Sequence, residues 1–373
     1  MLFRSVTDLV GVNQETGRVY FAGTRDDVLA RQVYAFDVDA PSRIARVTDL
    51  AFTNSGSMDK QGKTLVISRS ADAQPPQSYL ADGDGERLAW IEENRLDGDH
   101  PYAPYLSSHR AATFGTIPAA DGTPLHWMMI TPELEPGKRY PVFFEHYGGP
   151  HSQTVDKGWQ GALAQHIVDR GYIYFQIDNR GSANRGVAFE KAIYRAMGSV
   201  EVEDQKRGAE YLKTLDYVDP DRISIYGWSY GGYMTLKQLE ADPGLYAAGV
   251  SGAPVTKWEL YDTHYTERYM GTPQADAAAY AKSAVIEDAV KITDPLLVIH
   301  GMADDNVVFE NSSELISQLQ AEAVPFEMML YPGYTHRVSG PKISVHLWET
   351  IFGFLDRNCA GPTQQGLKSD KSK

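Results

Sequence analysis

The chain has 373 residues, of which 42% are hydrophobic and 23% are charged, a composition typical of a globular protein with one large domain and a smaller one. Its formal net charge of −14 argues against a nucleic-acid or anionic-membrane partner, because both of these carry negative charge. Cys359 is the single cysteine, which excludes an internal disulfide and a cysteine-based zinc site.

The sequence contains no recognisable targeting segment. Residues 1–6 are not followed by the apolar stretch of a secretory signal, and no run approaches the length of a transmembrane helix. Residues 361–373 include three lysines and few apolar side chains, so we expect this tail to be disordered.

Residues 1–115 predict a β-rich domain. Four strand-like segments, rich in apolar residues and separated by turn signals, lie at residues 17–23, 31–37, 63–68 and 86–91. A β-propeller blade is built from four strands, and this stretch holds at most about two blades, whereas a closed propeller takes about four to eight. The pattern therefore predicts either a partial β-propeller or a β-module of another kind.

Residues 116–360 predict an α/β domain, because strands alternate with helices along this part of the chain. Apolar runs predict strands at residues 140–145, 172–177, 223–226, 295–300 and 326–331. Helical spacing of apolar residues predicts helices at residues 159–169, 200–215, 230–240, 310–323 and 345–358. Repeated units of this kind imply a mostly parallel sheet with helices on both faces, whose ligand site lies beyond the carboxyl ends of the strands.

The segment Gly227–Gly231 matches the pattern G-x-S-x-G, with Ser229 at its centre. The bare pattern is weak in a chain with 33 glycines, but here an apolar strand leads into it and a helix follows it directly. This is the strand–turn–helix setting in which a nucleophilic serine is presented on a sharp turn. The sequence therefore predicts Ser229 as the nucleophile of a hydrolase.

A nucleophilic serine needs a base, and the base needs an acid that orients it; in this architecture they follow the serine in the order acid, then histidine. His336 lies in the loop after the predicted strand 326–331, whereas His346 falls within a predicted helix. Asp304 and Asp305 both follow the predicted strand 295–300. The pattern predicts His336 as the base and leaves the choice between the two aspartates open.

Several motifs together resemble the dipeptidyl peptidase IV branch of the prolyl oligopeptidase family. The match extends from about residue 116 to residue 358 and includes the nucleophile segment Gly-Trp-Ser-Tyr-Gly-Gly-Tyr at 227–233. The other matching segments are residues 147–150, 178–182, 201–205, 253–258, 265–271 and 300–307. Trp228 and the Asp-Asp-Asn-Val block at 304–307 favour this branch over related ones.

The resemblance implies an α/β-hydrolase domain at residues 116–360, preceded by the last blades of a β-propeller at residues 1–115. It makes Asp304 the acid of the triad and assigns the oxyanion hole to the hydroxyl of Tyr147 and the backbone N–H of Tyr230. It also implies an apolar, aromatic-walled substrate pocket, with Asn306 holding a substrate carbonyl. The residues implied for this pocket are Tyr230, Val255, Trp258, Tyr261, Tyr265, Asn306 and Val307.

The activity implied by this resemblance is release of N-terminal dipeptides with proline or alanine at the second position, through an acyl-enzyme and with no metal or cofactor. Alternatives with the same chemistry are an acylaminoacyl peptidase, an oligopeptidase or an esterase, and an alternative of another class is an inactive fragment. The expected partners are a peptide substrate and a second copy of the hydrolase domain. The resemblance suggests a periplasmic or secreted location for a full-length form, of which this sequence is expected to be a truncated version.

Overall fold

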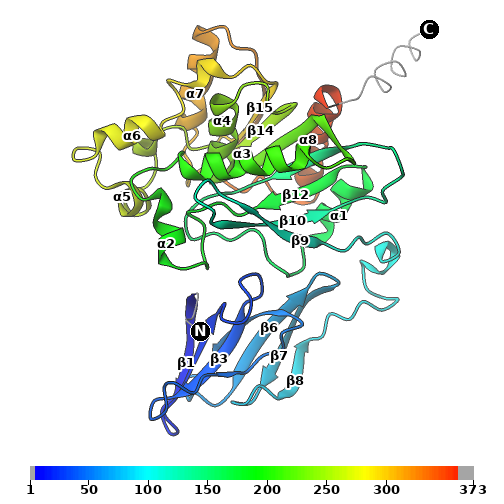
Figure 1. Cartoon of the computed structure of the whole chain (residues 1–373), viewed down its shortest axis with the longest axis vertical. Coiled ribbons are helices and arrows are strands. Elements are labelled where there is room, and N and C mark those ends of the chain that lie inside the picture. Colours follow the sequence, from blue (N-terminus) through cyan, green and yellow to red (C-terminus); the bar gives the residue numbers. More distant parts are fainter. Residues whose placement is uncertain (1–4, 360–373) are drawn as a thin grey trace. The chain divides into compact units, whose positions relative to one another are not determined.

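The computed structural model describes residues 5–359, which fall into two compact units (Figure 1). One unit contains the described residues up to Thr113, together with Val155–Arg170 and Ala183–Glu190. The other contains Phe114–Thr154, Gly171–Ser182 and the described residues from Lys191 onward. The tail at residues 361–373, for which we predicted disorder, lies outside the described residues.

The first unit contains two antiparallel sheets of four strands each, with the strands in chain order. The first sheet consists of β1 (Val6–Asn13), β2 (Arg18–Gly23), β3 (Gln32–Asp37) and β4 (Ala45–Arg46). The second consists of β5 (Thr53–Met58), β6 (Leu65–Ala71), β7 (Gln74–Ala81) and β8 (Arg87–Glu92). Two four-stranded sheets agree with the β-rich domain predicted for this part of the chain, which has room for at most about two blades. This unit also contains a 3-10 turn (Ala103–Tyr105) and the helices α1 (Gly161–Asp169) and α2 (Val187–Glu190).

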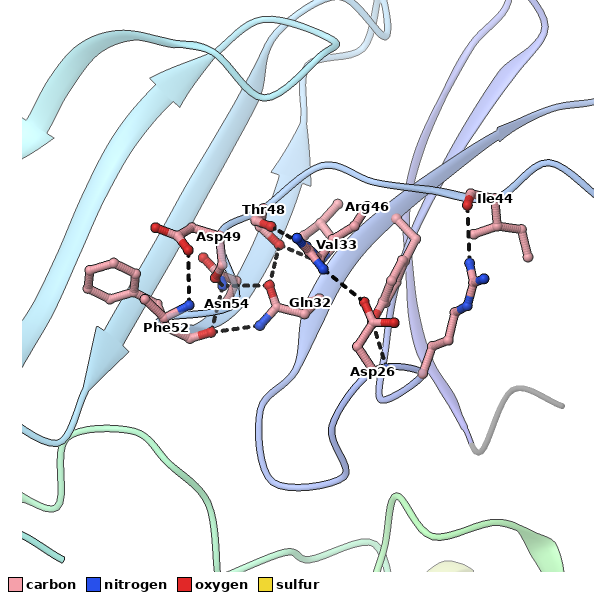
Figure 2. Close-up of polar contacts among 12 residues, drawn as sticks. Asp26, Gln32, Val33, Ile44, Arg46, Thr48, Asp49, Phe52 and Asn54 are labelled. Carbon is pink, nitrogen blue, oxygen red and sulfur yellow. Dashed lines mark hydrogen bonds and ion pairs between the residues drawn. The ribbon is translucent and has the colours of Figure 1, made fainter. Parts of the chain in front are cut away.

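The two sheets share one apolar core and one buried polar network. The core consists of Val10, Tyr20, Ala22, Val33, Ala35, Leu65, Ile67, Tyr79 and Ala81. In the network, shown in Figure 2, the side-chain oxygen of Gln32 accepts hydrogen bonds from Thr48 Oγ1 (2.8 Å) and Asn54 Nδ2 (3.0 Å). Gln32 Nε2 in turn donates to the carbonyl of Phe52 (2.7 Å). Because Gln32 belongs to β3 and Asn54 to β5, these bonds link the first sheet to the second.

The second unit is built on one eight-stranded sheet in the order β16-β15-β14-β13-β11-β12-β10-β9. Six strands run parallel to one another, and β10 pairs antiparallel with β12, so the sheet is mostly parallel as predicted. The strands are β9 (Thr113–Pro118), β10 (Pro124–Ile130), β11 (Tyr140–Glu145), β12 (Ile173–Ile177), β13 (Val218–Trp228), β14 (Ala248–Gly252), β15 (Leu296–Gly301) and β16 (Glu327–Tyr331).

Helices cover both faces of this sheet, as predicted. On β11 the ring of Phe143 faces Trp348 of α8 (Pro341–Asn358), with ring centroids 6.4 Å apart. The next side chain, Phe144, points to the opposite face, where Gly208 of α3 (Val200–Lys213) packs against its ring. The remaining helices are α4 (Tyr230–Ala241), α5 (Thr263–Met270), α6 (Ala277–Ser283) and α7 (Glu310–Ala321). Within residues 5–359, no helix has both the length and the apolar character that a membrane span requires.

Candidate active site

Ser229 lies between the end of β13 and the first residue of α4, on the sharp turn that the sequence predicts. Its backbone has φ = 62° and ψ = −119°, a conformation that costs a residue with a side chain about 1–3 kcal/mol. The turn is held in place because the N–H of Ser229 donates to the carbonyl of Gly252 on β14 (2.8 Å). The strain is therefore fixed by the neighbouring strand, and the serine is presented at the carboxyl end of β13.

The two glycines of the motif are required by close backbone contacts. A Cβ atom at Gly227 would lie 2.2 Å from the carbonyl oxygen of Gly231, and one at Gly231 would lie 2.4 Å from the carbonyl oxygen of His146. Both distances are far below van der Waals contact with backbone atoms that cannot move aside. The G-x-S-x-G spacing thus reflects how closely β13, α4 and the segment after β11 approach one another.

Asp304 and His336 form a hydrogen-bonded pair. Asp304 Oδ2 lies 2.7 Å from His336 Nδ1, and Asp304 Oδ1 accepts the backbone N–H groups of Asn306 (2.9 Å) and Val307 (3.0 Å). The Asp304 side chain is fully buried, whereas that of His336 is 19% exposed. Burial alone would raise the pKa of the Asp304 carboxyl, but hydrogen bonds from His300, His336 and the backbone outweigh it and hold the pKa below its ordinary value. The pair therefore consists of an ionised carboxylate and an imidazole it orients.

His300 is a further neighbour of this carboxylate, to which the sequence assigned no role. It is fully buried on β15, and its Nε2 lies 3.2 Å from Asp304 Oδ2 and 2.9 Å from the carbonyl of Val307. Its Nδ1 is hydrogen-bonded to Ser312 Oγ (2.7 Å). The one sequence feature that could have indicated this role is a single histidine at the carboxyl end of an otherwise apolar strand. Its contacts fix the loop that carries Asp304.

The loops after β13, β15 and β16 meet at one edge of the sheet. The indole Nε1 of Trp228, the residue before the candidate nucleophile, donates to the backbone carbonyl of His336 (3.0 Å). The N–H of Ala303 donates to the carbonyl of Tyr334 (3.0 Å), which ties the loop of the acid to the loop of the histidine. The structure therefore brings Ser229, Asp304 and His336 to neighbouring loops at the carboxyl ends of three strands.

Two candidate oxyanion donors lie beside Ser229. Tyr147 follows β11, and its hydroxyl lies close enough to Ser229 for the serine to lower the tyrosine pKa, against the effect of burial. Burial raises the pKa of Tyr147, so its hydroxyl keeps the proton that an oxyanion would need. Tyr230 is the first residue of α4, where a backbone N–H has no acceptor within the helix and meets the positive end of the helix dipole.

Aromatic rings form the candidate substrate pocket. The ring centroids of Trp258 and Tyr230 lie 5.5 Å apart. The ring of Trp258 also stacks on that of Tyr265, with a centroid distance of 6.3 Å. Tyr261 packs edge-on against Tyr265 at 5.3 Å, and its hydroxyl donates to Asn306 Oδ1 (2.9 Å). That bond leaves the amide Nδ2 of Asn306 as a donor. Of the remaining pocket residues implied by the resemblance, Val255 and Val307 are buried.

Glu201 lies behind this pocket and is fully buried on α3. Its Oε1 accepts a hydrogen bond from the hydroxyl of Tyr230 (2.9 Å), and its two oxygens also accept the backbone N–H groups of Gly198 and Ser199. Burial raises the pKa of Glu201 from 4.5 to about 7, although these hydrogen bonds oppose the shift. Glu201 belongs to a segment that carried the family resemblance, but no sequence pattern places it against Tyr230.

The raised pKa of Glu201 makes the stability of the fold depend on pH. Between pH 4.5 and about 7 the native state holds this proton more tightly than the unfolded chain does. The resulting stabilisation is fully present below the unfolded pKa and is lost as pH rises through the native pKa, a change of about 3 kcal/mol. We therefore expect Glu201→Gln, which cannot titrate, to gain stability relative to wild type across this interval in urea unfolding. Parallel pH profiles for the two proteins would contradict the raised pKa.

Comparison with known proteins gives the family. Residues 159–361 match the model of the prolyl oligopeptidase family, and residues 4–76 match that of the dipeptidyl peptidase IV N-terminal region. The chain is 32% identical to dipeptidyl peptidase 8 of Mus musculus over 363 residues, covering 94% of this chain and 40% of that protein. The crystal structure of Porphyromonas gingivalis dipeptidyl peptidase 4 superposes with a TM-score of 0.88 at 30% identity, covering 95% of this chain and 50% of that one.

The chain thus spans half the length, or less, of these relatives. The first family model covers more than half of the chain and contains all three loops that meet at the candidate site. The second covers most of the two four-stranded sheets. Together with the sheet and the serine turn, these matches show that the chain belongs to the prolyl oligopeptidase family.

Proposed function

We propose that this protein is a serine peptidase that releases N-terminal dipeptides with proline or alanine at the second position. The observation that carries the proposal is the strained turn at Ser229 and its link to the loop of His336. Trp228, next to the serine, donates a hydrogen bond to the backbone carbonyl of His336. The imidazole of His336 is in turn hydrogen-bonded to the buried Asp304. A serine held out of its relaxed conformation, on a loop joined to the loop of an oriented imidazole, supports nucleophilic catalysis by this serine. The names of the relatives, dipeptidyl peptidases 8 and 4, support peptides as the substrate class.

In the proposed reaction, Ser229 Oγ attacks the carbonyl carbon of the scissile peptide bond while His336 Nε2 takes the hydroxyl proton. The new C–O bond converts the carbonyl into an oxyanion, which the Tyr147 hydroxyl and the Tyr230 N–H stabilise. His336 then gives its proton to the departing amine as the C–N bond breaks, and an ester to Ser229 remains. Water, deprotonated by His336, attacks the ester carbon; the C–O bond to Ser229 breaks, the dipeptide is released, and His336 returns the proton to Ser229 Oγ. Asp304 stabilises the imidazolium that forms in each step.

The aromatic pocket accounts for the proposed specificity. A proline ring is flat, apolar and attached to a nitrogen with no N–H, so it needs contact surfaces and no hydrogen-bond partner. Tyr261 and Tyr265, which are partly exposed, present such surfaces, and the buried ring of Trp258 stacks on Tyr265 at an interplanar angle of 20° and supports it. The free amide Nδ2 of Asn306 supplies a donor for a carbonyl of the same dipeptide.

A substrate comparison tests this proposal. The wild-type protein should hydrolyse a chromogenic Gly-Pro substrate and a small chromogenic ester, both through Ser229. Tyr261→Ala and Trp258→Ala should each reduce kcat/KM for Gly-Pro by about ten- to 200-fold, because such apolar contacts are worth about 1–3 kcal/mol. Turnover of the ester, which does not fill the pocket, should change much less.

Two results would contradict the assignment. Equal losses on the two substrates would mean that these aromatic side chains support the fold and do not contact the substrate. Efficient cleavage of N-acyl substrates together with no cleavage of Gly-Pro would replace the dipeptidyl peptidase activity with that of an acylaminoacyl peptidase.

A further inference from the structure

The segment Glu201–Gln205 at the start of α3 has no part in the proposed reaction, yet its inward-facing side chains lie directly beneath the candidate site. Glu201, Asp204 and Gln205 are all buried, whereas Glu203 faces solvent. Buried ionisable and amide groups are costly unless they are hydrogen-bonded, so the partners of these side chains indicate what they do.

Glu201 connects α3 to the turn of the candidate nucleophile. Its carboxylate accepts the hydroxyl of Tyr230 at 2.9 Å, and it is fixed from the other side by the N–H groups of Gly198 and Ser199. Gly198 has φ = 78°, and a Cβ atom there would lie 2.2 Å from the hydroxyl of Tyr233, so the backbone that holds Glu201 is itself closely packed. The titratable side chains that face Glu201 are Tyr230 and Tyr233, both of α4.

Gln205, one helical turn later, connects α3 to the segment of the other candidate oxyanion donor. Its Nε2 donates to Asn179 Oδ1 and to the carbonyl of Ile177, both at 2.8 Å. Asn179 Nδ2 in turn donates to the carbonyl of Gly148 (3.0 Å), the residue that follows Tyr147. A single turn of α3 therefore holds the neighbours of both oxyanion donors.

We propose that Glu201 is a positioning residue for catalysis, an inference that rests on the proposed function. By fixing the Tyr230 side chain, Glu201 aims the Tyr230 N–H at the oxyanion. With Gln205 it makes α3 the common anchor of both donors. An apolar residue would fill the position of Glu201 without the cost of burying a carboxyl group, but it could not accept the Tyr230 hydroxyl. A displacement of about 1 Å at such a donor lowers the rate about 100-fold. We expect a loss on this scale when the contact between Glu201 and Tyr230 is removed.

The test compares Glu201→Leu, which cannot accept the Tyr230 hydroxyl, Tyr230→Phe and the double variant with wild type. Tyr230→Phe removes the hydroxyl that Glu201 binds and leaves the backbone donor in the chain. The readout is the second-order rate of labelling by a small fluorophosphonate, with turnover of the small ester normalised to the labelled fraction, so that unfolded protein does not contribute. Glu203→Leu, on the exposed face of the same helix turn, is the matched control.

We expect each single variant to lower both rates about ten- to 100-fold, and the double variant to be no slower than the slower single one, because both remove the same interaction. Glu203→Leu should match wild type. Wild-type rates in either single variant, or additive losses in the double variant, would overturn the role of Glu201 while leaving the peptidase assignment intact. If Glu201→Leu does not fold, Tyr230→Phe alone decides by the same criterion. Absence of labelling in the wild type would instead refute the proposed function, and this inference with it.

Discussion

Asp304→Ala should lower turnover by about four orders of magnitude, whereas Asp305→Ala should leave it within a few-fold of wild type. The two aspartates are adjacent in sequence but differ in environment. Asp304 is fully buried and lies 2.7 Å from His336 Nδ1, whereas Asp305 is exposed. Removal of the Asp304 carboxylate leaves His336 without the group that selects its tautomer and stabilises its charge.

The measurement is kcat/KM for the chromogenic Gly-Pro substrate on both variants, with circular dichroism to establish that each is folded. Asp305→Ala is the matched control, because it removes the same side chain one position away. A similar loss in both variants would mean that Asp304 is not the acid of the triad, whatever its distance from His336.

The α/β part of the fold was predictable because its strands are short apolar runs flanked by helices of regular spacing. The strand β11 was predicted residue for residue at 140–145, and α4 was predicted to within one residue. The strand β14 was missed, since Ala248–Gly252 has one large apolar residue, Val250. A Cβ atom at Gly252 would lie 2.0 Å from the ring of Trp228. This glycine weakens the apolar pattern of the strand, but it is required by a packing contact that only the structure shows.

In the β-rich part, two of the strands that the sequence did not predict, β5 and β7, contain polar residues or prolines that interrupt the alternating pattern. The strand β7 contains Pro75 and Pro76, which normally argue against a central strand, and β5 contains Asn54, whose side chain is used in the buried network of Gln32 (Figure 2). Neither feature can be read from periodicity, because it depends on partners distant in sequence.

The candidate site was predictable to the extent that its residues follow strands. Ser229, Asp304 and His336 come after strands β13, β15 and β16, and parallel strands end at the same edge of a sheet. The choice of Asp304 over Asp305 required the family resemblance, and the structure adds the burial that separates them. The contact of Glu201 with Tyr230 joins residues 29 apart on two different helices, and no spacing rule predicts it.

Every step of the proposed reaction depends on Ser229 as the nucleophile. Ser229→Ala deletes one oxygen atom from a side chain that is only partly buried, so we expect the variant to fold and to melt within a few degrees of wild type. We expect turnover of the Gly-Pro substrate to fall by about six orders of magnitude, to the level left by binding and the oxyanion hole alone.

The most direct measurement is covalent labelling by a fluorophosphonate, followed by mass spectrometry of the intact protein. The wild type should gain one phosphonyl group, located on the peptide that contains Ser229, and Ser229→Ala should gain none under the same conditions. Labelling that persists in folded Ser229→Ala, or a label found on another residue of the wild type, would contradict the account.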